Sequence, residues 1–289
     1  MNRQASNNVE FWKRPHVLAC CFVVVSMFGC MTEGNAQSKS LWLIAGQSNA
    51  VGQGDSTLSP VCEVGSAWEY VYASDVLIQL ADPVGERGLN FEAAHSGSIA
   101  PAFAKTFSTY AHKPVVVIAA ARGGSACHRR AELNNYGTWD TSGDLLLFDA
   151  AIQKVKAAEK KTKESLEGIV WLQGERDANA INAGTLTAAE YEQSLVDLVN
   201  RFRKSLGDQV PFYIVQTGYY TDHPREGFDA VREAQRHVAT ALKNTFIAYT
   251  ETHTFEARGW MKDQIHYNQT GLNHIGTTVA EVISKRNDQ

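Results

Sequence analysis

Cysteine is scarce in this sequence, and most of it lies near the N-terminus. Three of the five cysteines fall within the first 30 residues, which leaves only Cys62 and Cys127 for the rest of the chain. A small fold held together by many disulfides is therefore excluded. The two remaining cysteines can pair in an oxidising compartment or stay as buried free thiols, and the sequence leaves both possibilities open.

An excess of charge of either sign is also missing. The 27 basic and 31 acidic residues nearly balance, and the formal net charge is -4. A protein that binds nucleic acid or an anionic membrane through its charge needs a basic excess or a basic patch. We therefore expect no nucleic-acid partner.

No apolar run has the length of a transmembrane helix. The run at residues 17–28 is too short to span a bilayer. It follows Lys13 and Arg14 and leads to small residues that end at Ala36, which is the pattern of a secretory signal peptide. We expect residues 1–36 to be removed, and residues 37–289 to form one domain of a secreted or periplasmic protein. Processing as a lipoprotein, with a lipid anchor at Cys30, is the alternative.

Short apolar runs alternate with amphipathic stretches after residue 40, which predicts an α/β fold. Both faces of a parallel sheet are covered, so its strands are apolar throughout. The segment 52–97 is rich in turn residues and predicts no clear element; it can fold as an insertion over the sheet. The expected strands are 41–45, 115–121, 168–172, 212–217 and 246–250, and the expected helices are 146–160, 188–205, 225–243 and 270–285.

Polar clusters follow several of the expected strands. In an open parallel sheet, ligands bind beyond the carboxyl ends of the strands, so clusters at these positions converge. Acyl transfer needs such a set of groups: a serine, a histidine to take its proton, and a carboxylate to orient the histidine. The clusters are Gly46-Gln47-Ser48-Asn49, Arg122-Gly123-Gly124-Ser125, Gln173-Gly174-Glu175-Arg176-Asp177 and Asp263-Gln264-Ile265-His266.

These clusters supply one residue for each role. Ser48 is the candidate nucleophile, His266 the base, and Asp263, three residues before it, the orienting carboxylate. A tetrahedral intermediate also needs hydrogen-bond donors for its oxyanion. The backbone amides of Ser48 and Gly124 and the side-chain amide of Gln173 are the candidate donors.

Each residue also has a simpler explanation. A serine after a strand often caps a helix, and paired glycines often form tight turns. Glu175 and Asp177 can cap the helix that follows, or belong to a glycosidase or metal site. No histidine-rich ligand spacing accompanies them, so we expect no metal and no cofactor. The combination of clusters, rather than any single one, favours acyl transfer.

The sequence resembles the SGNH/GDSL-type hydrolases, specifically the sialate O-acetylesterase-like branch that includes the acetylxylan esterases of carbohydrate esterase family six. The resemblance implies a flavodoxin-like three-layer α/β/α sandwich with a mostly parallel five-stranded sheet. It also implies a metal-free serine esterase with the nucleophile, base, orienting residue and oxyanion donors named above, supported by Gln47, Asn49, Gly123, Glu175 and Asp177. The motifs that carry it are G-Q-S-N at 46–49, A-R-G-G-S at 121–125, W-L-Q-G-E-R-D at 171–177 and D-Q-I-H-Y-N at 263–268.

Two departures from the family pattern leave this chemistry intact. Ala50 stands where many relatives carry methionine, and Ser125 stands in place of threonine. Ala50 also breaks the G-x-S-x-G pattern, which disfavours an α/β-hydrolase. We therefore expect a serine esterase that removes acetyl groups from an acetylated carbohydrate. The alternatives are a lipid or thioester hydrolase on the same fold, and a non-catalytic carbohydrate-binding relative.

Overall fold

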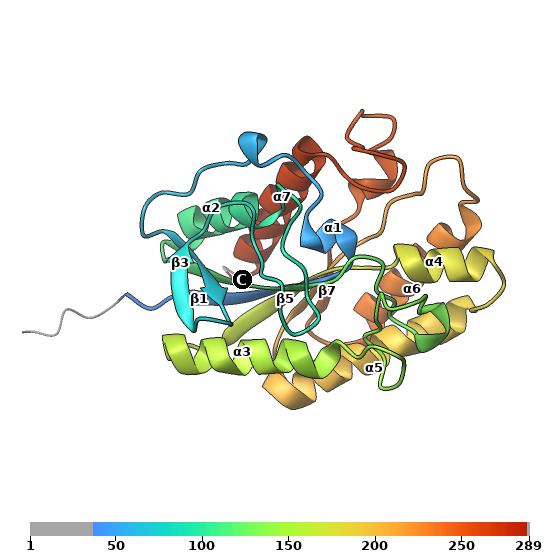
Figure 1. The fold of residues 1–289 in the computed structure, drawn as a ribbon, viewed down its shortest axis with the longest axis horizontal. Coiled ribbons are helices and arrows are strands. Elements are labelled where there is room, and N and C mark those ends of the chain that lie inside the picture. The colour runs from blue at the N-terminus through green and yellow to red at the C-terminus, as the bar shows by residue number, and fades with distance from the viewer. Residues whose placement is uncertain (1–36, 288–289) are drawn as a thin grey trace, which may run out of the picture. The chain divides into compact units, whose positions relative to one another are not determined.

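The computed structural model describes residues 37–287, and a single sheet forms the centre of this region (Figure 1). The expected signal peptide and Cys30 lie outside the described residues. Within them, no helix combines the length and apolar character that a membrane crossing requires.

The sheet has seven strands in the order β3-β2-β4-β1-β5-β6-β7. All neighbouring pairs are parallel except β2 and β3. The three-layer fold expected from the sequence is confirmed, but the expected number of five strands is wrong. The strands are β1 Ser40–Gly46, β2 Ala67–Val71, β3 Val76–Gln79, β4 Val115–Ala121, β5 Leu166–Leu172, β6 Phe212–Val215 and β7 Thr245–Tyr249.

The two additional strands come from the segment that the sequence left unassigned. β2 pairs with β4, and β3 pairs with β2 at the edge of the sheet. Edge strands need not be apolar on both faces, because one side is open to water. β3 has only four residues, and although Val76 and Ile78 are apolar, their side chains are exposed. So short an apolar run among turn residues does not by itself indicate a strand.

Helices cover both faces of the sheet (Figure 1). In this view α2 and α7 lie above the sheet, and α3 and α5 lie below it together with α6. A short helix, α4, follows β5. Their bounds are α2 Ala100–Ala111, α3 Phe148–Thr162, α4 Glu175–Asn182, α5 Ala188–Leu206, α6 Glu226–Ala241 and α7 Gln269–Asn287.

Alternation along the central strand β1 divides the core into two layers. Leu41 and Leu43 face the layer of α3, α5 and α6, whereas Trp42 and Ile44 face α2 and α7, as the period of two in a strand requires. The Trp42 ring packs edge-on against Phe103 and Phe107 of α2, at centroid distances of 5.5 and 5.0 Å.

Helix α5 has a capping motif at its start and a regular apolar spacing, the two local features that define a helix in the sequence. Thr187 and Glu190 form a capping box at its start, in which each side chain accepts a hydrogen bond from the other residue's backbone N–H. Leu195, Leu198 and Phe202 are fully buried. These apolar residues, at helical spacing, therefore lie on the face of α5 that packs against the core, as the sequence predicts.

The two cysteines of the described region are free thiols. Cys62 belongs to the core layer of α2 and α7, and Cys127 to the layer on the opposite face of the sheet. A disulfide requires Cα atoms within about 7 Å. Because the sheet separates them, the two cysteines remain buried and unpaired.

A buried polar cluster attaches the segment of β2 and β3 to the sheet. The Lys154 ammonium of α3 donates to the Ala119 carbonyl at 2.7 Å and lies 3.2 Å from the Glu86 carboxylate. Glu69 on β2 accepts a hydrogen bond from the Gly85 amide at 2.7 Å. Burial of the Glu69 carboxyl raises its pKa to about 7 from an ordinary value of 4.5.

This raised pKa predicts a pH-dependent stability. The folded state holds the Glu69 proton more tightly than the unfolded state. The contribution of Glu69 to stability therefore falls as pH rises from 4.5 toward 7, and it does not change at higher pH. The free energy of unfolding that is lost over this range is on the order of 3 kcal/mol. Glu69→Gln keeps the acceptor for the Gly85 amide but has no carboxyl group to titrate. Its melting temperature should therefore fall less between pH 5 and 8 than that of the wild type. Glu63→Gln, at an exposed position of the same segment, is the control, and equal slopes for Glu69→Gln and wild type would contradict the prediction.

Gly46 allows the ends of β1 and β5 to approach closely. Its φ is +143°, and a Cβ at this position would lie 1.9 Å from the Leu172 carbonyl oxygen. The next residue, Gln47, donates its amide to the same oxygen at 2.9 Å. A side chain at 46 would therefore separate the two strand ends from which the polar clusters project.

Gly46→Ala should accordingly be strongly destabilising. We expect a loss of about 3 kcal/mol or more, or roughly 10 °C in melting temperature, because backbone rather than a flexible side chain must move. Gly88→Ala is the matched control, since a Cβ there meets nothing within 4 Å. Thermal unfolding of both variants tests this, and a Gly46→Ala protein as stable as the control would refute it.

Candidate active site

Ser48, His266 and Asp263 lie in hydrogen-bonding contact at the carboxyl edge of the sheet. His266 Nε2 is 3.0 Å from Ser48 Oγ, and His266 Nδ1 is 2.8 Å from Asp263 Oδ2. The other oxygen of Asp263 accepts the backbone amides of Ile265 and His266, at 2.9 and 2.8 Å. Asp263 thus holds both the ring and the backbone of the histidine.

Ser48 is positioned by the turn from β1 into α1, a helix of one turn that spans Ser48–Val51. The residue that caps this helix is Gln47, and it makes no side-chain capping bond. Ser48 is the first residue of the helix, so its hydroxyl does not cap α1. Ser48 is 8 % exposed, and its hydroxyl lies against the His266 ring.

Asn49 connects the serine to the loop that carries the histidine. Its side-chain oxygen accepts the Tyr267 amide at 3.1 Å. Its Nδ2 donates to Glu175 at 2.8 Å and to the Ile265 carbonyl at 3.3 Å. Both neighbours of His266 are therefore hydrogen-bonded to the residue after Ser48, which fixes the distance between the two side chains.

Glu175 is fully enclosed at the start of α4. One carboxylate oxygen accepts from Asn49, and the other has no hydrogen-bond partner among the described residues. Burial raises the pKa of this carboxyl, although the Asn49 hydrogen bond and the nearby His266 oppose the shift. The hydrogen bond from Asn49 to Glu175 therefore helps to fix the orientation of the Asn49 side chain.

Asp177 attaches the loop after β4 to α4. Its carboxylate accepts the backbone amides of Cys127 and His128, each at 2.9 Å, and the Gln173 side-chain amide at 2.5 Å. Burial raises the pKa of Asp177, against the effect of these three donors. The carboxylate thereby holds the loop that contains the glycine pair.

The structure does not bring the Gln173 side-chain amide to the serine. Its Nε2 donates to Asp177 and, at 3.2 Å, to the Ser125 carbonyl, and the residue is 1 % exposed. Both amide hydrogens are therefore used within the protein interior. The sequence motif indicated a polar residue at this strand end but not the direction of its side chain.

Among the backbone amides near Ser48, those of Ser48 itself and of Gly124 have no protein acceptor within residues 37–287. The neighbouring Gly123 amide instead donates to Glu92 at 3.3 Å. Gln47 offers a third group. Its Oε1 accepts the amides of Gly174 and Arg176 at 3.2 and 3.3 Å, while its Nε2 has no such bond in the described part of the chain.

Ser48 and His266 lie in the wall of a hollow of about 570 Å³, together with Gln47 and Gly124. Its size suits a small ligand. Several lining residues were not identified from the sequence, because they lie in the unassigned segment, in loops without a motif or, for Asn179, in α4 beyond the motif. They are Gln53, Glu92, His95, Tyr136, Asn179 and Tyr220. Arg176, inside a recognised motif, also lines the hollow.

Metal-ligating side chains do not gather in the described residues: no group of three or more His, Cys, Asp or Glu is arranged to hold an ion there. Glu175 and Asp177 instead accept hydrogen bonds from protein donors.

Several solved structures have a similar fold. A protein of Arabidopsis thaliana is 18% identical, with a TM-score of 0.66 over 87% of this chain and 99% of its own. A carbohydrate acetylesterase from Xanthomonas citri is 16% identical, with a TM-score of 0.54 over 86% of this chain and 57% of its own. A carbohydrate esterase family 2 enzyme with a carbohydrate-binding domain, from Corynascus thermopiles (Myceliophthora fergusii), is 12% identical, with a TM-score of 0.50 over 87% and 67%.

The family comparison covers nearly the whole described region. No curated protein sequence matches the chain. The family model described as "Carbohydrate esterase, sialic acid-specific acetylesterase" matches residues 38–285. The protein therefore belongs to this family of carbohydrate esterases and is a carboxylic ester hydrolase, as the resemblance of its motifs indicated.

Proposed function

We propose that this protein is a secreted serine esterase that removes small acyl groups, above all acetyl, from carbohydrates through a Ser-His-Asp acyl-enzyme mechanism. The observation that carries the proposal is the contact of His266 with Ser48 on one side and with Asp263 on the other. This is the arrangement that converts a serine hydroxyl into a nucleophile at neutral pH.

In the proposed reaction, His266 accepts the Ser48 proton as Oγ attacks the acyl carbonyl carbon. The tetrahedral intermediate collapses when His266 gives that proton to the sugar oxygen, which leaves as an alcohol. Water then attacks the acyl-serine, with His266 again as the base, and acetate is released. Asp263 fixes the imidazole tautomer and stabilises the imidazolium that forms in each step.

Asp263 is suited to remain ionised during this reaction. Partial burial raises its pKa, but the hydrogen bonds from the Ile265 and His266 amides and from the His266 ring outweigh burial, and the pKa lies below its usual value. The carboxylate is therefore charged throughout the neutral and mildly acidic range.

For the oxyanion hole we propose the amides of Ser48 and Gly124 together with the Gln47 side chain. The two backbone amides have no protein acceptor in the described region. Gln47 lines the hollow, and its orientation is fixed because its oxygen accepts two backbone amides of the α4 turn. Donors held in place before the reaction need no reorganisation as charge develops. Gln173, whose donors are bound elsewhere, has a structural part in this proposal.

The hollow also favours a sugar over the alternative substrates. Most of its side chains are polar, including Gln53, Glu92, His95 and Asn179, and these can bond to sugar hydroxyls. A lipid or long thioester chain requires an apolar channel. A carbohydrate-binding relative without activity has no need of a histidine held against a serine.

For the N-terminal region we propose that residues 1–36 are removed on export and that residues 37–289 form the mature domain. The basic, apolar and small-residue regions of residues 13–36 support this. Lipid attachment at Cys30 is the alternative.

Ser48→Ala and His266→Ala should lose activity by several orders of magnitude in kcat, since members of a catalytic triad act as a unit. Asp263→Asn should also be severe, because the amide favours the wrong imidazole tautomer. Hydrolysis of p-nitrophenyl acetate measures these losses, with melting temperatures as the control for folding. A folded Ser48→Ala protein with wild-type kcat would refute the assignment of the nucleophile.

The two glutamines should behave differently. Gln47→Glu keeps the acceptor for the Gly174 and Arg176 amides but removes the donor, so kcat should fall by about 10²–10³ or more with little change in KM. Gln173→Ala should act mainly on melting temperature, because Asp177 loses a buried donor. The opposite pattern, a stable Gln173→Ala protein with low kcat and an active Gln47→Glu protein, would return Gln173 to the oxyanion hole.

A further inference from the structure

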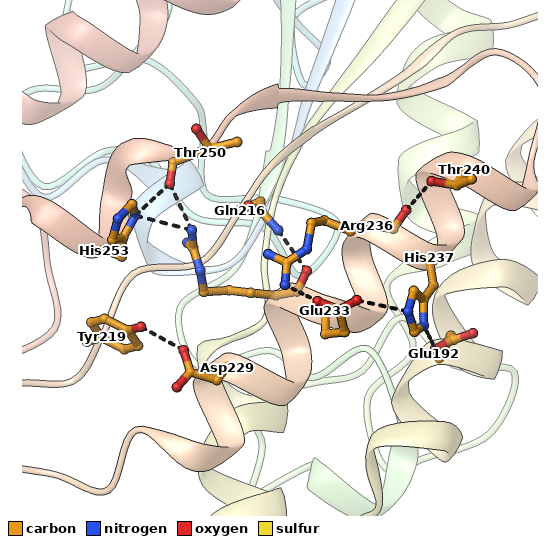
Figure 2. A network of polar contacts seen from close by, with 11 residues as sticks. Glu192, Gln216, Tyr219, Asp229, Glu233, Arg236, His237, Thr240, Thr250 and His253 are labelled. Carbon is orange, nitrogen blue, oxygen red and sulfur yellow. Dashed lines mark hydrogen bonds and ion pairs between the residues drawn. The ribbon is translucent and has the colours of Figure 1, made fainter.

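Two tyrosines line the hollow that contains Ser48, and they come from different loops. Tyr136 belongs to the loop between β4 and α3, and Tyr220 to the loop after β6. The neighbouring Tyr219 does not line the hollow, and its hydroxyl donates to Asp229 of α6 at 2.6 Å (Figure 2). Tyr136 and Tyr220 are therefore the two phenol rings that a substrate in the hollow can contact.

The Tyr136 ring packs against Gly124. A Cβ at Gly124 would lie 2.9 Å from Cγ and 3.0 Å from Cδ2 of this ring, and the φ of Gly124 is +70°. Both the close contact and the left-handed backbone favour a glycine at this position. Because the Gly124 amide is one of the proposed oxyanion donors, the ring lies beside the place where the acyl carbonyl binds in the proposed reaction.

Hydrogen bonds hold the backbone on both sides of Tyr136. Arg122 donates to the Asn135 carbonyl at 2.8 Å, and the Ala126 amide donates to the Gly137 carbonyl at 3.0 Å. The Tyr136 side chain itself is 43 % exposed. The ring is therefore a partly exposed wall of the hollow that is formed before a ligand binds, as is usual in binding sites for small molecules.

The proposed mechanism decides on which side of the nucleophile each part of the substrate lies. The carbonyl oxygen binds in the oxyanion hole beside Gly124, and the sugar oxygen lies at His266, from which it takes its proton. The loop of Tyr220 adjoins the loop of this histidine, because the Thr221 amide donates to the Gln264 carbonyl at 2.8 Å. Tyr220 is therefore on the side of the sugar.

The acyl chain takes the remaining direction from the tetrahedral carbon, where Tyr136 bounds the hollow beside the glycine pair. Glu92 is the other large side chain there, and its Oε2 accepts the Gly123 amide at 3.3 Å. A chain longer than acetyl meets either the ring or this carboxylate. Overlap with the ring is a steric cost, and an apolar chain placed against a carboxylate removes water from the charge.

We propose that Tyr136 sets the acyl specificity of this enzyme: its ring closes the hollow on the acyl side and restricts the substrate to acetyl esters. This inference rests on the proposed esterase function. The sugar lies on the opposite side, at Tyr220, so different loops select the two parts of the substrate. Tyr136 touches the acyl group and has no part in proton transfer.

The test compares the p-nitrophenyl esters of acetate, butanoate and hexanoate, which differ only in the acyl chain. The measured quantity is the ratio of kcat/KM for each longer ester to that for the acetate. For the wild type we expect a butanoate ratio of about 0.05 or less, and a lower ratio for the hexanoate, since each methylene changes binding in a fitted pocket by roughly tenfold or more.

Tyr136→Ala should raise the butanoate ratio about tenfold or more, and the hexanoate ratio at least as much, because the chain can then occupy the space of the ring. Tyr136→Phe keeps the ring and should keep the wild-type ratios. A loss of support for Gly124 would lower kcat for all three esters alike and leave the ratios unchanged. A rise in the ratios therefore reports on the acyl side of the hollow and not on the stability of the loop.

Two other tyrosines supply controls. Tyr220→Ala removes the ring on the sugar side and should leave the chain-length ratios unchanged. Tyr110→Ala is the matched control outside the hollow, since Tyr110 is 51 % exposed and lies on α2. It should keep the wild-type kcat/KM for every ester. Melting temperatures confirm that each variant is folded.

The acetate ester separates the two levels of the argument. If the wild type fails to hydrolyse p-nitrophenyl acetate, the proposed function is wrong. If it hydrolyses all three esters equally well, or if a folded Tyr136→Ala protein keeps the wild-type ratios, the esterase stands and the role of Tyr136 is overturned. An equal rise of the ratios in Tyr220→Ala would overturn it as well.

Discussion

The candidate active site depends on the hydrogen bonds of the Asn49 side chain. This one amide contacts Glu175 at the start of α4 and both neighbours of His266, and it follows Ser48 directly in the chain. A strand end, a helix start and a distant loop are thereby held in one geometry. Other hydrogen bonds hold this loop, such as those from the Thr221 amide to the Gln264 carbonyl and from the Gly218 amide to the Tyr267 hydroxyl, but they do not reach the turn that carries Ser48.

The acidic residues of the site fall into two groups that their environments separate. Asp263 is half-exposed, receives two backbone amides and has a lowered pKa, so it can carry the charge that orients His266. Glu175 and Asp177 are buried, and their pKa values are raised. Their hydrogen bonds go to side chains and loop amides of the protein. The first is therefore suited to catalysis and the other two to support.

The segment between β1 and α2 forms one wall of the hollow that contains Ser48 and His266. Gln53, Glu92 and His95 come from this segment. It is attached through the pairing of β2 with β4 and through the buried cluster of Glu69, Glu86 and Lys154. This attachment involves none of the three triad residues, so the wall and the triad are held in place by separate contacts.

The sequence alone determined the layers of the fold, five contiguous strands of the sheet from β4 to β7, and the polar residues that meet at their carboxyl edge. Apolar runs and helical spacing report burial directly, and parallel strands bring their carboxyl ends to one edge, so Ser48, Asp263 and His266 could be identified together. Only the tertiary structure decided where individual side chains point. Gln47 and Gln173 have the same chemistry and both follow a strand, but one faces the hollow and the other is bonded to Asp177. Strands β2 and β3 and the separation of Cys62 from Cys127 likewise depend on contacts between segments distant in sequence, which local patterns do not encode.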